Sequence, residues 1–286
     1  TTAQVQALTT TQVQALSTDQ LNAMESADLQ LLSSTQLRSL TSSQVAGLSS
    51  AQIQNLTSSQ VASLSSTQLR SLTSDQLNAV ESADLQALTS AQIQGLTTDQ
   101  VSALSSTQVQ TLTTLQVASL TSTQVRALTS DQLNALESAD LQALTSAQLP
   151  GLTTAQLSTL TTSQLELLTT GQVRGLTAAQ IASFSTDQIP LLTTAQVQAL
   201  TTTQVQALST DQLNAMESAD LQLLSSTQLR SLTSNQLTGF TNPQLQFLTG
   251  SQVATLSNSQ LSLLSSTQLT ALQLQGLSTD QLALLR

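Results

Sequence analysis

The sequence predicts an all-α protein, an α-solenoid in which every eight residues form one very short, capped helix. Three observations predict this fold. Apolar residues recur at a fixed spacing of eight. Each repeat, or octad, carries a hydroxyl and a Gln at the spacing of a helix N-terminal capping box. Each octad also has only about two large aliphatic side chains, so the repeats must stack to bury them.

The octad register is continuous over most of the chain. We number its positions 1 to 8, so that position 8 falls on every multiple of eight. Position 8 is Leu from Leu8 to Leu272, except at Met24, Val80, Phe184, Met216 and Phe240. Position 5 is Val, Ile or Leu, position 4 is Gln or Asp, and position 1 is Thr or Ser except at Glu25, Glu81, Glu137, Glu217 and Gln273.

The register predicts the domain organisation. We expect a single array of 34 octads over residues 1–272 with no domain boundary, followed by an irregular C-terminal repeat or cap at 273–286. Three residues of the repeat are missing between Leu272 and Leu277, which places the irregularity there.

Each octad contains the signals that start a helix. If Thr9 is the N-cap, Gln12 falls at N3 and completes the capping box, while Leu8 and Val13 take the N′ and N4 positions of a hydrophobic staple. Leu16 then ends this helix and precedes the next N-cap. Eight residues are thus a cap plus roughly one and a half to two turns. A helix this short is marginal in water, so we expect stability to come from packing between octads.

Two other folds were compared with this one. In one continuous α-helix, eight residues overshoot two turns by about 80°, so the apolar stripe would wind around the helix. A β-solenoid remains the alternative, although positions 5 and 8 would face opposite sides of a strand. Its turns would also favour Gly, Asn, Asp or Pro, and the chain has eight Gly and three Pro.

Composition restricts the classes of function. The net charge is −10, and six scattered Arg make no basic patch, so nucleic acid is not an expected partner. No apolar run of about 18 residues predicts a membrane span. The chain has no Lys, His, Cys or Tyr, so a Ser-His-Asp triad is impossible and we predict that the protein is not an enzyme and needs no cofactor. The chain begins in mid-pattern, as expected of a mature form or an excised piece.

Acidic residues form the local charge clusters. The motif DQLNA-x-ESADLQ occurs four times, the first three copies 56 residues apart, and its acids are candidate Ca²⁺ ligands because Ca²⁺ prefers carboxylate oxygens. The alternative is that these acids favour helix N-termini, since no EF-hand spacing is present. The candidates are Asp19, Glu25, Asp28, Asp75, Glu81, Asp84, Asp131, Glu137, Asp140, Asp211, Glu217 and Asp220.

Other polar rows have structural explanations. The Gln row at position 4 could recognise a ligand or form a hydrogen-bonded ladder, but the capping box already accounts for it. The hydroxyl rows could bind ice or sugar, although the first hydroxyl of each octad is expected to be used as a cap. The Arg residues at position 6 should face water or pair with nearby acids. They are Arg38, Arg70, Arg126, Arg174 and Arg230.

Two resemblances accompany this reading. LTTDQVSAL at 96–104 resembles the first-helix opening of transcription activator-like effector repeats, but the second helix and base-reading loop are absent, so their DNA binding is not implied. Over the whole chain, the Ser/Thr/Gln/Ala-rich octads resemble the repetitive regions of large bacterial secreted or surface proteins.

We therefore expect a non-enzymatic structural repeat at an extracellular or cell-surface location: a stalk, spacer, adhesin or self-assembling filament segment. Self-association, end-to-end or lateral, is the expected partner interaction, because the ends of stacked repeats are unsatisfied surfaces. The alternative is a binding module that displays hydroxyls and acids to Ca²⁺, a cell-surface glycan or ice.

Overall fold

The computed structural model describes residues 2–274 and 276–283. Every regular element in these residues is a helix, and no strand occurs among them. The prediction of an α-solenoid is confirmed, and the β-solenoid alternative is not supported. The chain divides into two compact units, Thr1–Gly151 and Leu152–Arg286, which are described separately. The prediction of a single array over 1–272 stays a prediction.

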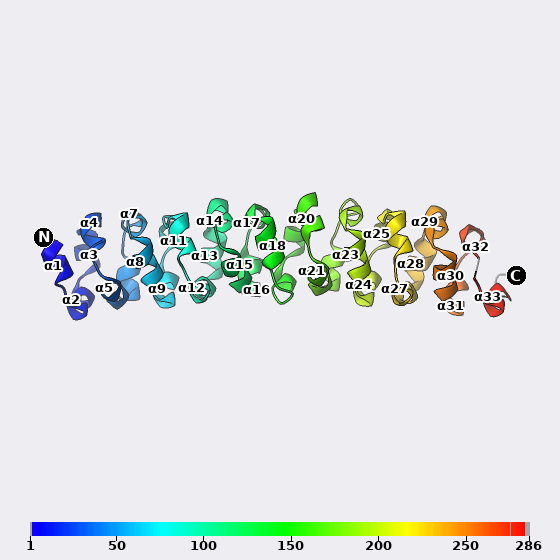
Figure 1. The fold of residues 1–286 in the computed structure, drawn as a ribbon, viewed down its shortest axis with the longest axis horizontal. Helices are drawn as coiled ribbons and strands as arrows, with labels where there is room; N and C mark the ends of the chain where they lie inside the picture. The colour runs from blue at the N-terminus through cyan, green and yellow to red at the C-terminus, as the bar shows by residue number, and fades with distance from the viewer. Residues whose placement is uncertain (1, 275, 284–286) are drawn as a thin grey trace. The chain divides into compact units, whose positions relative to one another are not determined.

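In the first unit the helices follow one another in chain order, coloured blue to green in Figure 1. They are α1 (Thr2–Gln6), α2 (Thr10–Ala15), α3 (Thr18–Asn22), α4 (Ser26–Leu29), α5 (Ser34–Ser39), α6 (Ser42–Ala46), α7 (Ser50–Gln54), α8 (Ser58–Ser63), α9 (Ser66–Ser71), α10 (Ser74–Asn78), α11 (Ser82–Gln86), α12 (Ser90–Gly95), α13 (Thr98–Ala103), α14 (Ser106–Gln110), α15 (Thr114–Ser119), α16 (Ser122–Ala127), α17 (Ser130–Ala135), α18 (Ser138–Ala143) and the 3₁₀ helix η1 (Leu149–Gly151).

The second unit repeats the same plan. Its helices are α19 (Thr154–Ser158), α20 (Thr162–Leu167), α21 (Thr170–Gly175), α22 (Ala178–Ala182), the 3₁₀ helix η2 (Ile189–Leu191), α23 (Thr194–Ala199), α24 (Thr202–Ala207), α25 (Thr210–Ala215), α26 (Ser218–Gln222), α27 (Ser226–Ser231), α28 (Ser234–Gly239), α29 (Asn242–Phe247), α30 (Gly250–Thr255), α31 (Asn258–Leu261), α32 (Ser266–Ala271) and α33 (Thr279–Ala283).

The octad around α13 shows why each helix starts and stops where it does. The Thr97 hydroxyl accepts from the Gln100 amide at 3.1 Å, and Gln100 Oε1 accepts from the Thr97 amide at 2.9 Å, which completes the predicted capping box. The helix ends at Leu104, whose extended backbone (ψ 140°) leads into the next N-cap. Position 8 therefore ends one helix and leads into the next, which explains the period of eight.

The N-cap hydroxyl makes a measurable contribution to stability. Thr97→Ala should lower the free energy of unfolding by about 1 kcal/mol, because the Gln100 amide loses its partner while the rest of the octad is unchanged. Chemical denaturation of the two proteins measures the difference. Thr97→Ser keeps the hydroxyl and should cost only a few tenths of a kcal/mol; an equal loss in both variants would contradict this role.

Two octads with Pro at position 6 form 3₁₀ helices instead of α-helices. Pro150 and Pro190 have no amide hydrogen, so the i to i−4 bond of an α-helix is missing and the shorter turn of η1 and η2 forms. The capping interaction survives, because the Thr145 amide still donates to Gln148 Oε1 at 2.7 Å. Pro changes the helix type without interrupting the repeat.

The core consists of two apolar rows and one polar row. Side chains at positions 5 and 8 are buried in nearly every octad, and the Gln at position 4 is buried with them. Positions 1, 2, 3 and 6 are largely exposed, and position 7 is intermediate. Helices three apart in the chain lie in contact, as α6 does with α9 and α9 with α12, so successive turns of a superhelix bury these rows.

The three-residue deletion near the C-terminus is absorbed locally. Gly276 has φ +91°, which a residue with a Cβ rarely adopts, and α33 then begins with the usual pattern. The Ser278 amide donates to Gln281 Oε1 at 2.9 Å, and Gln281 Nε2 reaches the Leu256 carbonyl, 25 residues earlier, at 2.9 Å. The predicted irregular repeat at 273–286 is thus a shortened octad over the residues described there.

Candidate functional site

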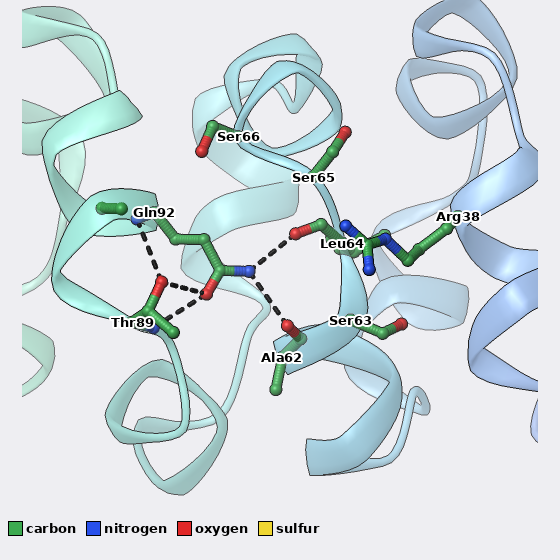
Figure 2. A pocket seen from close by; sticks show the side chains of 9 residues that line it. Arg38, Ala62, Ser63, Leu64, Ser65, Ser66, Thr89 and Gln92 are labelled. Carbon is green, nitrogen blue, oxygen red and sulfur yellow. Dashed lines mark hydrogen bonds between the residues drawn. The ribbon is translucent and has the colours of Figure 1, made fainter.

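The position-4 Gln makes two kinds of contact at once. Gln92 Oε1 accepts from the amide of its own N-cap, Thr89, at 2.8 Å (Figure 2). Its Nε2 donates to the carbonyl oxygens of Ala62 at 3.0 Å and Leu64 at 2.6 Å, which belong to the preceding superhelical turn. The side chain is 7% exposed. One buried amide therefore caps its own helix and links it to the turn before.

The same bridge recurs in both units and gives the size of the superhelical turn. Gln132 donates to Val101 and Leu104, and Gln204 donates to Val173 and Leu176, 31 and 28 residues earlier in each case. The row is thus the hydrogen-bonded ladder considered from the sequence. A turn contains between three and four octads, a number that the sequence did not give.

A second set of bonds comes from position 6. Asn22 Nδ2 donates to the Gly47 carbonyl at 2.7 Å and Gln86 Nε2 to that of Thr111 at 2.6 Å, each 25 residues later. Arg230 Nε donates in the same way to the Thr255 carbonyl at 2.9 Å. Although the Arg side chains at position 6 are exposed as predicted, Arg230 also satisfies the end of a helix in the next turn.

Small residues at position 7 allow the turns to approach closely. A Cβ added to Gly95 would lie 2.9 Å from Ser66 Cβ, and one added to Gly47 would lie 2.6 Å from Thr18 Cγ2. Both pairs are 29 residues apart, position 7 against position 2 of an earlier octad. The expected role of small residues before each Leu is therefore supported at these glycines.

The twelve acidic candidates occupy three octad positions. The position-3 acids (Asp19, Asp75, Asp131, Asp211) and the N-cap acids (Glu25, Glu81, Glu137, Glu217) are exposed, whereas the position-4 acids are half-buried at Asp28 and buried at Asp84, Asp140 and Asp220. Because 56 residues span about two superhelical turns, the first three clusters do not lie in adjacent turns. No three acidic side chains in the described residues come together to hold a metal. Metal binding by the candidates stays a prediction.

Where Asp replaces Gln, both contacts of the amide change. The N-cap glutamates Glu81, Glu137 and Glu217 make no side-chain capping bond. A carboxylate also cannot donate to the carbonyls of the preceding turn. Two of the aspartates accept a hydroxyl from position 2 instead: Ser58 donates to Asp84, and Thr194 is bonded to Asp220. These octads therefore lose the Gln bridge.

Burial raises the pKa of Asp220 above 3.8; the hydrogen bond from Thr194 opposes this shift, and the nearby Glu217 carboxylate adds to it. The folded state therefore holds its proton more tightly than the unfolded chain. The carboxyl disfavours folding only once it ionises, so stability is lost as the pH rises through the folded-state pKa.

Asp220→Gln should therefore stabilise the protein at neutral pH by about 1 kcal/mol, by restoring a donor to the preceding turn. The gain should be smaller near about pH 3, where Asp220 is protonated in both states. Denaturation at both pH values measures the difference. Asp211→Asn, an exposed acid in the same cluster, is the control, and a gain that is equal at both pH values would contradict the assignment.

The surface between turns carries a repeated shallow groove. In Figure 2 it is lined by Arg38, by residues 62–66 and by Thr89, Ala91 and Gln92. Equivalent residues, 24 or more octad positions along the chain, form a groove with Arg174 in the second unit. A third groove contains Glu137 and Asp140 in place of a hydroxyl and Gln. The grooves are lined mainly by hydroxyl, amide and backbone groups.

The link between turns was missed from the sequence, although a signal for it exists. A capping box accepts Glu as readily as Gln at N3, yet Glu never occurs at position 4 in this chain. Glu could cap its helix but could not donate to the preceding turn. The exclusion of Glu therefore points to a required donor.

No helix in the described residues is long or apolar enough to span a lipid bilayer.

The fold and its internal ladder define a class, the helical solenoid repeat proteins. Within this class, the chain belongs to the ALTTAQ repeat family, whose model matches more than half of its length, at residues 21–58, 77–114, 133–170, 162–194 and 213–250. A comparison with curated proteins found no match.

Proposed function

We propose that this chain is a non-enzymatic structural repeat, a spacer or stalk segment that separates whatever is attached to its two ends. The observation that carries the proposal is the use of its buried polar groups. The position-4 Gln side chains are consumed by capping and by the bridges between turns, as Gln92 shows. The repeat therefore invests its specific chemistry in holding itself together.

The location and self-association proposed for it rest on composition. Charged residues are 8% of the chain, Cys is absent, and the octads are rich in Ser, Thr, Gln and Ala, as in the bacterial surface repeats that the sequence resembles. We place the protein outside the cell or on its surface, where end-to-end or lateral association would build a filament or an adhesin stalk. Nucleic acid is not a proposed partner, since the net charge is −10.

Variation of the repeat number tests the spacer function. Deletion of residues 77–132 removes seven octads, about two superhelical turns, and keeps the octad register. Dyes on Cys residues introduced at the two ends of the chain, which has no native Cys, report the end-to-end distance by energy transfer. The distance should shorten on deletion and lengthen when the block is duplicated. A distance that does not change with repeat number would contradict a spacer.

The alternative is a binding surface for ice or a glycan, favoured by the exposed hydroxyls at positions 2 and 3. An ice-recrystallisation assay and glycan-array binding of the full chain test it. Activity that survives a shuffled order of octads but is lost when the position-2 and position-3 hydroxyls become Ala would favour binding over spacing.

A further inference from the structure

The octad that begins at Glu137 has acceptors where other octads have a donor. In a standard octad, the position-8 carbonyl of the preceding turn accepts from a Gln amide, as Leu64 does from Gln92 at 2.6 Å. The equivalent carbonyl here is that of Leu112, and the residue facing it is Asp140. No protein donor reaches the Leu112 oxygen among the described residues, so a buried acceptor is left unsatisfied.

Asp140 is itself a buried acceptor without a partner. Its side chain is 4% exposed and lines the groove with Leu112. Unlike Asp84, which accepts from Ser58, its carboxylate has no hydrogen bond within the part of the chain that the structure describes. A buried carboxylate is costly unless a donor or a cation neutralises it.

The other groups in this groove are also oxygen ligands. Thr114 contributes a hydroxyl, and Glu137 contributes a second carboxylate that forms no capping bond to α18. Gln110 lies at the same wall of the groove. The side chain of Gln86, which also lines it, is already committed to the Thr111 carbonyl at 2.6 Å. The donor set is therefore two carboxylates, a carbonyl and a hydroxyl from two superhelical turns.

We propose that this groove binds a divalent cation, Ca²⁺ by its donor set, which bridges α18 to the turn before it in place of the missing Gln amide. Asp140 and Glu137 supply the charge, the Leu112 carbonyl and Thr114 hydroxyl supply neutral oxygens, and water completes the six to eight oxygens that Ca²⁺ prefers. The cation does for this octad what Gln92 Nε2 does for its own. Asp84 and Asp220 differ, because a hydroxyl from the preceding turn already meets each carboxylate.

Hydrogen exchange of the full chain with and without Ca²⁺ tests the site. Two peptides report on it specifically, since Leu115 marks one side of the groove and Pro150 follows the other in sequence found once in the chain. With a dissociation constant of about 10⁻⁴ M, Ca²⁺ at about 1 mM should slow amide exchange in both peptides by about tenfold. Mg²⁺ at the same concentration should have a smaller effect, because it dehydrates reluctantly.

Two variants separate the site from general charge effects. Asp140→Gln restores the standard octad, so exchange at both peptides should be slow without Ca²⁺ and unchanged by it. Asp131→Asn removes one exposed acid of the same cluster and should leave the Ca²⁺ response intact. No Ca²⁺ response at neutral pH, or an equal response in Asp140→Gln, would overturn the proposal. Slowing that follows acidification alone would show instead that a proton on Asp140 bonds the Leu112 carbonyl.

Discussion

Replacing Gln132 by Leu is expected to lower the free energy of unfolding by about 3 kcal/mol, although the volume of the side chain changes little. The side chain is 2% exposed and accepts from the Thr129 amide at 2.7 Å. Its Nε2 donates to the carbonyls of Val101 at 3.0 Å and Leu104 at 2.6 Å. The variant leaves an amide and two carbonyls buried without partners. Urea denaturation, with hydrogen exchange to detect local opening in a repeat array, measures the loss.

The matched control is Gln94→Leu, the same chemical change at an exposed position 6. The Gln94 side chain makes no hydrogen bond in the described part of the chain, so its replacement should alter stability by less than about 0.5 kcal/mol. Similar losses in the two variants would show that the buried amide is not the link between turns.

Replacing Gly151 by Ala is expected to have the second largest effect, a loss of about 2 to 3 kcal/mol. The 3₁₀ geometry of η1 brings Gly151 against α16, and an added Cβ would overlap the backbone carbonyl of Ser122. A backbone oxygen cannot move aside as the end of a flexible side chain can, so the two turns must separate. The melting temperature and the exchange rates of α16 amides measure the effect.

Gly171→Ala is the control with the opposite expected sign. Gly171 lies in α21, and the nearest atom to an added Cβ is Thr169 Oγ1 at 3.8 Å, which is ordinary contact. Without a clash, Ala favours a helix over Gly by about 0.5 to 1 kcal/mol, so this variant should be slightly stabilised. A loss at Gly171, or none at Gly151, would contradict the close approach of turns.

The sequence predicted the local structure because the local signals agree in each octad. Thr97 and Gln100 have the spacing of a capping box, and Leu104 ends the helix at the point where the next cap begins. These interactions span at most a few residues, so their spacing in the chain specifies their geometry. The exceptions were also local: Pro150 and Pro190 lack an amide hydrogen, and their octads form 3₁₀ helices.

The contacts between turns could not be predicted because they depend on the pitch of the superhelix. Gln92 meets Leu64 only because a turn contains between three and four octads, and this number follows from small backbone angles at positions 8 and 1. The same limit applies to the acidic candidates. The sequence identified Asp140 and Glu137, but the Leu112 carbonyl facing them became evident only from the stacking.

The register between turns is the central claim, and disulfide formation tests it most directly. The chain contains no Cys, so only an introduced pair can react. Ser66→Cys should be combined in turn with Cys at Ala87, Gly95 or Ala103, all at position 7. A Cβ at Gly95 would lie 2.9 Å from Ser66 Cβ, and a small relaxation brings the pair to disulfide geometry. We predict rapid oxidation of the 66–95 pair and none of the other two; preferential oxidation of 66–87 or 66–103 would contradict a turn of between three and four octads.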